Sequence, residues 1–202
     1  MQVTREGGSR SPAALARRAQ IVQATIAVIA QEGYPQASFA RIAEQAGLSS
    51  TRLISYHFTG KEGLVAAVVH EIVTAMGDEV GRQVMAQPDA RGMLRAYVEG
   101  VVAYTAAHRE DLVALLQILT GGGFPQEVQA ATAVPGHVER ILAEGQRTGQ
   151  FRPFDVRVTA MAVQRAVEGV AFALHLDADL DVTGYGVELA DLFERATRAD
   201  AR

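Results

Sequence analysis

A run of short hydroxyl side chains followed by an arginine stands at positions 49 to 52. A hydroxyl can donate and accept hydrogen bonds, and the guanidinium of Arg52 can bond O6 and N7 of one guanine together. The run therefore has the donors that read base edges in DNA. Groups a few residues further on suit phosphates, whose contacts position a protein on a duplex without reading its sequence. The residues predicted to contact DNA are Ser38, Ser49, Ser50, Thr51, Arg52, Ser55, Tyr56, His57 and Lys61.

Two short helices joined by a tight turn are expected to hold this run. The pattern predicts one helix over 39–45 and a second over about 49–57, with Ser49 as its cap. Ala46 allows the two helices to approach closely, and Gly47 can adopt the turn conformation that side chains disfavour. Such a pair is a helix-turn-helix, whose second helix presents its N-terminal end to the major groove.

A longer helix over 12–32, starting at a Ser11 cap, is expected to support the pair. Ile42 and Ala43 would face this helix, and Leu53 would anchor the second short helix in the core. The alternative interpretation is a compact three-helix unit with a glycine turn that binds no DNA, because short helix pairs are common and turn patterns are weakly specific.

A string of short motifs runs through residues 17–64. It comprises Glu32-Gly33-Tyr34, Ser38 to Ala43, Ala46-Gly47-Leu48-Ser49, Tyr56-His57-Phe58 and Gly60-Lys61-Glu62 with Leu64. This string resembles the TetR family of bacterial transcriptional regulators. The sequence departs from the family pattern in two ways. Thr51 stands near the position where the family usually has a small residue, and one extra residue lies between Ser49 and Phe58. The resemblance implies a dimer that binds a palindromic operator, more commonly as a repressor, and that a small-molecule effector releases.

Composition bounds the other possibilities. The chain has 202 residues, 49% hydrophobic and 21% charged, with a net charge of −4 and no cysteine. These values indicate a soluble globular protein of a reducing cytoplasm. No secretory signal or membrane span is expected, because the N-terminus is polar and the longest uncharged stretch, 112–126, is too short. Residues 1–62 hold seven basic and four acidic side chains, and the remainder 12 and 19, so the N-terminal part suits a polyanion.

Helical periodicity continues along the rest of the chain. The expected fold class is all-α with about nine helices: a three-helix helix-turn-helix head and a helical body for ligand binding and dimerisation. The predicted domains are a basic arm over 1–11, a DNA-binding domain over 12–60 and the body over 61–202. The body helices are expected over about 60–86, 89–108, 110–119, 136–148, 156–176 and 184–198.

The helix over 156–176 is apolar nearly all round, so it must be buried on more than one side. We expect it to pair, together with the last helix, with the same helices of a second subunit, which the family resemblance also implies. The alternative is a central core helix in a monomer. The predicted interface residues are Val163, Val167, Val170, Phe172, Leu174, Leu189, Leu192 and Phe193.

The resemblance also implies a small-molecule pocket among the body helices. Ordinary core packing is the alternative for each candidate, because aromatic residues at helical spacing are usually just buried. The candidate lining residues are Tyr97, Val101, Tyr104, Gln117, Phe124, His137 and Ile141.

Metal, cofactor and enzyme functions find little support. Asp177, Asp179, Asp181 and Glu188 fit a calcium-loop spacing, but Val182 replaces the glycine that the loop needs. No cofactor motif or catalytic motif is present, so no cofactor, metal or enzymatic activity is expected. Two alternatives stay open: a DNA-binding module without a ligand, and an enzyme that uses His137 with Glu139 or Glu144. Ligand-dependent loss of DNA affinity would distinguish the regulator from both.

Overall fold

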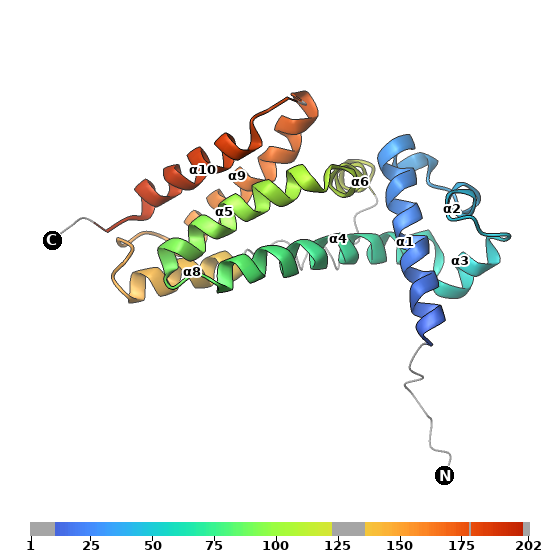
Figure 1. The fold of residues 1–202 in the computed structure, drawn as a ribbon, viewed down its shortest axis with the longest axis horizontal. Helices are drawn as coiled ribbons and strands as arrows, with labels where there is room; N and C mark the ends of the chain where they lie inside the picture. Colours follow the sequence, from blue (N-terminus) through green and yellow to red (C-terminus); the bar gives the residue numbers. More distant parts are fainter. Residues whose placement is uncertain (1–10, 123–135, 178, 200–202) are drawn as a thin grey trace, which may run out of the picture. The chain divides into compact units, whose positions relative to one another are not determined.

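The computed structural model describes residues 11–122, 136–177 and 179–199. Over these residues the chain is all-α, as predicted, apart from one 3-10 turn and an isolated bridge between Phe151 and Arg198. The chain divides into two compact units, whose helices are labelled in Figure 1. The described residues of Met1–Val69 and Ala114–Phe124 form the first unit, the head, and those of His70–Val113 and Pro125–Arg202 form the second, the body.

The head contains α1 (Pro12–Glu32), the 3-10 turn η1 (Tyr34–Gln36), α2 (Phe39–Gln45), α3 (Arg52–His57), the start of α4 (Gly60–Met85) and the end of α6 (Arg109–Thr120). The predicted Ser11 cap is confirmed, and Ser38 caps α2 in the same way. The Ser11 hydroxyl accepts a hydrogen bond from the N–H of Ala14, and the Ser38 hydroxyl accepts one from the N–H of Arg41, each at 3.3 Å. These bonds satisfy N–H groups that have no partner within the first helical turn.

The apolar stripe of α1 supplies much of the head's core. By length and composition α1 could also cross a membrane. However, Ile21, Ile26 and Ile29 are at most 2% exposed, and α1 packs against α2. Burial of one face against a neighbouring helix is what a core helix requires. The remaining buried side chains of the head include Val22, Ile42, Ala43, Ala46, Ile54, Phe58, Leu64, Val65 and Val68.

The helix α4 belongs to both units, because the division after Val69 falls inside it. Leu64, Val65 and Val68 of α4 are each at most 1% exposed and lie in the head. The head therefore extends further along the chain than the domain end predicted at residue 60.

The body contains the rest of α4, α5 (Ala90–Ala107), the start of α6, α8 (Gly136–Arg147), α9 (Val156–Leu176) and α10 (Val182–Thr197). Aspartates begin three of these helices by accepting a bond from an N–H three residues on. Asp89 bonds Gly92 at 2.8 Å, Asp155 bonds Val158 at 2.9 Å and Asp181 bonds Gly184 at 3.0 Å. The carboxylates also favour helix formation through their charge, which opposes the positive helix end.

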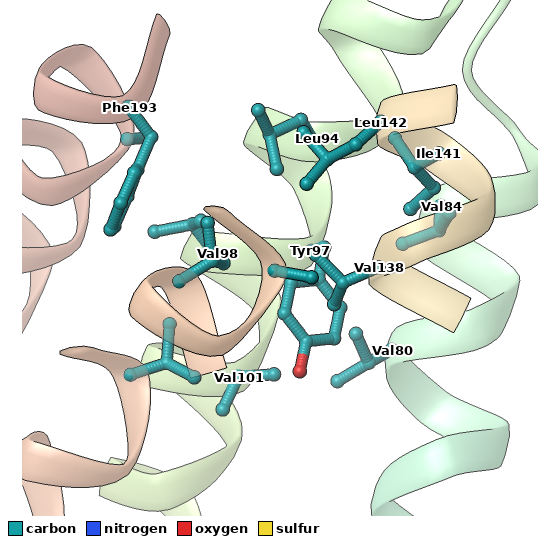
Figure 2. Close-up of a cluster of buried hydrophobic side chains, with 14 of the residues drawn as sticks. Val80, Val84, Leu94, Tyr97, Val98, Val101, Val138, Ile141, Leu142 and Phe193 are labelled. Carbon is teal, nitrogen blue, oxygen red and sulfur yellow. The ribbon is translucent and has the colours of Figure 1, made fainter. Parts of the chain in front are cut away.

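One large core cluster holds the body together, with side chains from α4, α5, α8, α9 and α10. Figure 2 shows the Tyr97 ring among side chains that include Val80, Val98 and Val138. The Tyr97 hydroxyl donates to Oε1 of Gln164 at 2.6 Å, so this buried polar group is satisfied.

The end of α8 is closed by a tight turn onto Phe151. The carbonyl of Gly145 accepts hydrogen bonds from the N–H groups of Gln150 at 2.9 Å and Phe151 at 3.0 Å. The Phe151 ring is 4% exposed, and a β-carbon on Gly145 would lie only 2.0 Å from one of its ring carbons. The close approach of the ring to the helix backbone therefore requires glycine here.

Candidate DNA-binding surface

The turn between α2 and α3 has the geometry that the sequence predicts. Gly47 has φ of 63°, in the left-handed region that favours glycine, and Ala46 is 5% exposed. The Gln20 side chain on α1 donates to the carbonyl of Ala46 at 2.7 Å. This bond satisfies a carbonyl at the end of α2 and fixes the turn against α1.

Seven of the nine predicted DNA-contacting residues are exposed: Ser38, Ser49, Ser50, Thr51, Arg52, Ser55 and Tyr56. Tyr56 is the most prominent, with 81% of its surface exposed. Within the described part of the chain, the Arg52 side chain has no ion-pair partner. The surface formed by residues 49–56 thus offers a free guanidinium, several hydroxyls and a phenol.

The helix α3 begins later than predicted. Ser49 is not its cap; Thr51 holds that position, and its side chain makes no capping bond. The Ser50 hydroxyl instead accepts from the N–H of Arg52 at 3.2 Å. Hydrogen bonds within this loop satisfy N–H groups at the start of α3, so no capping bond from Ser49 is needed.

The buried residues of α3 also differ from the prediction. Ile54 is fully buried and Phe58 is 5% exposed, whereas Leu53 is 37% exposed. The prediction that Leu53 anchors α3 is therefore wrong by one residue. Leu53 instead lies beside Arg52 on the exposed side, where an apolar group can contact a thymine methyl. The spacing of Ile54 and Phe58, four residues apart, is the sequence signal that identifies the buried face.

His57 and Lys61 are partly buried. The Lys61 ammonium donates to the carbonyl of Tyr34 at 3.1 Å and lies 4.4 Å from the centre of the Tyr34 ring. An ammonium has three N–H donors, so Lys61 keeps donors for a phosphate while it holds η1 in place. The guanidinium of Arg18, a residue that the sequence analysis did not select, lies 5.0 Å over the Phe58 ring at the end of α3.

Arg41 is the contrasting basic residue of the head. Its guanidinium pairs with both Glu32 and Glu44. These bonds raise the pKa of Arg41 and lower the pKa of Glu32. Arg41 is therefore occupied within the protein, whereas Arg52 is available to an outside acceptor.

We expect Arg52→Ala to weaken binding to a specific DNA site by roughly 1 to 3 kcal/mol, the usual discrimination of a bidentate arginine–guanine contact. Arg52→Lys is the matched variant, because it keeps the charge and loses the planar fork. It should bind random DNA as the wild type does but discriminate less at one base pair. Fluorescence anisotropy with matched and mutated duplexes measures both effects. Wild-type affinity of Arg52→Ala for the specific site would exclude Arg52 from base reading.

The predicted pocket residues do not all come together. Tyr97, Val101, Tyr104 and Ile141 belong to the main core cluster of the body, and the His137 ring lies 5.0 Å from that of Tyr97. Gln117 belongs to the head, where its side chain lies near Gly33. Phe124 lies outside the described residues. A pocket formed by all seven residues stays a prediction.

Two surface hollows formed by described residues lie elsewhere in the body. One is lined by Asp89, Arg91, Gly92, Arg95 and Glu194, and another by Asp191, Glu194, Arg195 and Arg198. Ion pairs of Arg95 with Asp191 and Glu194 occupy this region. Arg91 and Arg95 are therefore committed to carboxylates of α10.

Most predicted interface residues are buried inside one subunit. Val163, Val167 and Val170 are at most 1% exposed, Leu174 is 8% and Phe193 is 7% exposed. Such side chains have little surface left for a partner in the single subunit, and their assignment to an interface stays a prediction. Leu189 is half-buried against the core. Phe172 and Leu192, at 54% and 58%, do remain exposed, and α9 and α10 present further apolar surface through Val158, Met161, Leu176 and Val187.

Two residues of the enzyme alternative, Glu144 and His137, have shifted pKa values. The Glu144 carboxylate accepts from the Arg147 guanidinium at 2.6 Å, which lowers the pKa of Glu144. The pKa of His137 is lowered by desolvation and by Arg140. Within 11–122, 136–177 and 179–199, no three His, Asp or Glu side chains are arranged to hold a metal ion.

Comparison with known proteins agrees with this geometry. A model of bacterial regulatory proteins of the tetR family matches residues 21–68. HTH-type transcriptional regulator BetI 1 of Chromohalobacter salexigens is 38% identical over 85 residues, 42% of this chain and 42% of that protein. The chain thus matches about two fifths of that relative's length.

Two solved structures share the fold. A putative transcriptional regulator from Saccharomonospora viridis in complex with choline has a TM-score of 0.78 at 21% identity, over 92% of this chain and 100% of that one. FadR from Bacillus subtilis in complex with stearoyl-CoA has a TM-score of 0.72 at 20% identity, over 87% and 96%.

The head is therefore a helix-turn-helix domain in which the second helix of the pair is exposed. Its matched segment contains the whole of α2, the glycine turn and α3. Over residues 21–68 the chain is therefore similar to bacterial regulatory proteins of the tetR family.

Proposed function

We propose that the protein is a sequence-specific transcriptional regulator that binds a palindromic DNA operator as a homodimer. The observation that carries the proposal is the exposed surface of residues 49–56 at the start of α3, with Arg52 free of any ion pair. The start of a recognition helix is where side chains reach base edges in the major groove. The family's relatives are regulators, which supports DNA binding over enzymatic activity.

The exposed apolar face of the body supports the homodimer. Phe172 and Leu176 on α9 are 54% and 86% exposed, and Leu192 on α10 is 58% exposed. Covering these large apolar side chains with a second copy would remove their surface from water, which is favourable. A two-fold dimer would place its recognition helices roughly 34 to 36 Å apart, in successive major grooves.

Release by a small molecule completes the proposal. Two proteins of the same fold have been solved with choline and with stearoyl-CoA. A ligand that favours a state with a different spacing of the recognition helices would lower DNA affinity. A cytoplasmic location and repression rather than activation belong to the same proposal.

Selection of the purified protein on random duplex DNA tests the proposal directly. It should be made at about 0.15 M salt, because nonspecific phosphate binding weakens steeply with salt. We expect enrichment of a two-fold symmetric site. A lack of enrichment at every salt concentration would overturn the proposed function. Sedimentation of the free protein as a 21.6 kDa species at micromolar concentration would overturn the dimer.

A further inference from the structure

The hydroxyl of Tyr104 is a buried polar group without a partner. Tyr104 is 2% exposed, and its oxygen makes no hydrogen bond within the described part of the chain. The ring stacks on that of His108, with ring centres 4.0 Å apart. The other buried phenol of α5, Tyr97, bonds Gln164. A buried hydroxyl left unbonded is costly, so Tyr104 leaves a place for an acceptor or donor that the described residues do not supply.

Two carboxylates from two helices lie beside the His108 ring of this pair, and the charge of Glu71 on α4 also acts on Tyr104. Oε2 of Glu79 on α4 lies 3.8 Å from Nε2 of His108, and Oδ2 of Asp111 on α6 lies 3.7 Å from Nδ1. Desolvation raises the pKa of the Tyr104 hydroxyl, and the charges of Asp111, Glu79 and Glu71 raise it further. The cluster of Glu71, Glu79, Tyr104, His108 and Asp111 lies wholly within the body.

The cluster carries an excess of negative charge. Within the described residues, neither Glu71 nor Glu79 is paired with an arginine or a lysine. Burial raises the pKa of Asp111, and Glu110 and Glu71 raise it further although His108 acts in the opposite direction. Carboxylates held together without a full complement of positive charge favour a cation at their centre.

We propose that the cluster formed by Glu71, Glu79, Tyr104, His108 and Asp111 binds a protonated amine. An ammonium with N–H groups can donate to the Tyr104 oxygen and to a carboxylate at once. A quaternary ammonium has the charge but no donor for the hydroxyl. This inference deepens the proposed function. Only the amine's role as effector rests on that function; the binding site itself does not.

Entry of the amine requires the body to open locally, because the Tyr104 oxygen is closed to solvent. The groups that would hold the amine lie on α4, α5 and α6, and α4 continues into the head as one helix. A ligand that favours the open arrangement of these helices shifts the population toward it. Binding of the amine at the cluster can therefore change the conformation of α4.

Isothermal titration calorimetry with the full-length protein and no DNA tests the site. The probe is butylammonium chloride, compared with 1-butanol, which has no charge, and tetramethylammonium chloride, which has no N–H. We expect a dissociation constant of roughly 1 mM for so small a cation. Butanol should give no saturable heat, and tetramethylammonium should bind at least roughly tenfold more weakly.

Two variants of the site and one matched control complete the test. Asp111→Asn and Tyr104→Phe should each weaken butylammonium binding by roughly tenfold. Asp78→Asn removes an exposed carboxylate next to Glu79 on α4 and should leave binding unchanged. Tyr104→Phe removes a hydroxyl that has no partner, so its melting temperature should not fall.

The outcomes separate this inference from the proposed function. Absence of butylammonium binding, equal binding of tetramethylammonium, or wild-type binding by both site variants would overturn the amine site. None of these results affects the DNA selection, which needs no ligand. If the amine binds as expected, adding it should also weaken operator binding; an unchanged operator affinity would remove its role as effector.

Discussion

Replacing Gly145 by alanine should lower the free energy of unfolding by about 2 to 3 kcal/mol, at the upper end of the cost of overpacking a core. The new β-carbon would lie 2.0 and 2.3 Å from two ring carbons of Phe151. The ring is 4% exposed, so it cannot move aside without disturbing the core cluster to which it belongs. Urea unfolding followed by circular dichroism measures the change.

The control is Gly77→Ala, in the exposed middle of α4. No atom lies within 4 Å of the β-carbon that Gly77 would gain. Alanine has the higher helix propensity, so this variant should gain roughly 0.5 to 1 kcal/mol. The two substitutions are chemically identical and should have opposite signs. A stabilising effect of both would show that Phe151 does not constrain Gly145.

The double variant Phe172→Arg with Leu176→Arg should dissociate the proposed homodimer and weaken binding to the symmetric operator at least roughly hundredfold. Both side chains are exposed in the single subunit, so arginine is tolerated there without loss of the core. In the dimer two arginine pairs would face each other, and the second half-site contact would no longer come from the same molecule. Sedimentation and anisotropy with the selected operator measure the two effects.

Met85→Arg provides the matched control for this variant. Met85 is 76% exposed at the end of α4, away from α9 and α10 in the sequence. The variant Met85→Arg replaces an exposed apolar side chain by arginine without altering the proposed interface. The control should remain dimeric and bind the operator normally. A dimer that survives both arginines on α9 would refute the use of this face.

Local signals in the sequence were sufficient where the structure depends on local bonds. Ser11 and Ser38 start their helices through hydroxyls that accept from an N–H three residues on. Gly47 has the positive φ that the turn requires. Each of these features is decided within four residues of the chain, so residue type and spacing predict it well.

The start of α3 could not be predicted from such signals. Ser49, Ser50 and Thr51 are all good capping residues, and the sequence alone does not decide which one starts the helix. Leu53 and Ile54 are neighbouring apolar residues, and the sequence alone does not decide which of them is buried. The structure buries Ile54 and exposes Leu53.

The apolar helix α9 shows a second limit. Val163 and Val167 are buried in the core, whereas Phe172 on the same helix is 54% exposed. A helix that is apolar nearly all round gives no polar face from which to tell its core side from its interface side. The positions of α5, α8 and α10 around it decide the matter, and these long-range contacts leave no periodic signal in the sequence.

The shared helix α4 has a consequence for making chimeric regulators. Leu64, Val65 and Val68 are buried in the head although they follow the recognition helix, and Ala114 and Ile118 of α6 are buried in the same unit. A crossover at residue 60 would separate the head from part of its own core and leave apolar side chains exposed. An exchange of operator specificity between relatives should therefore move the crossover beyond Val69 and carry the end of α6 along with it.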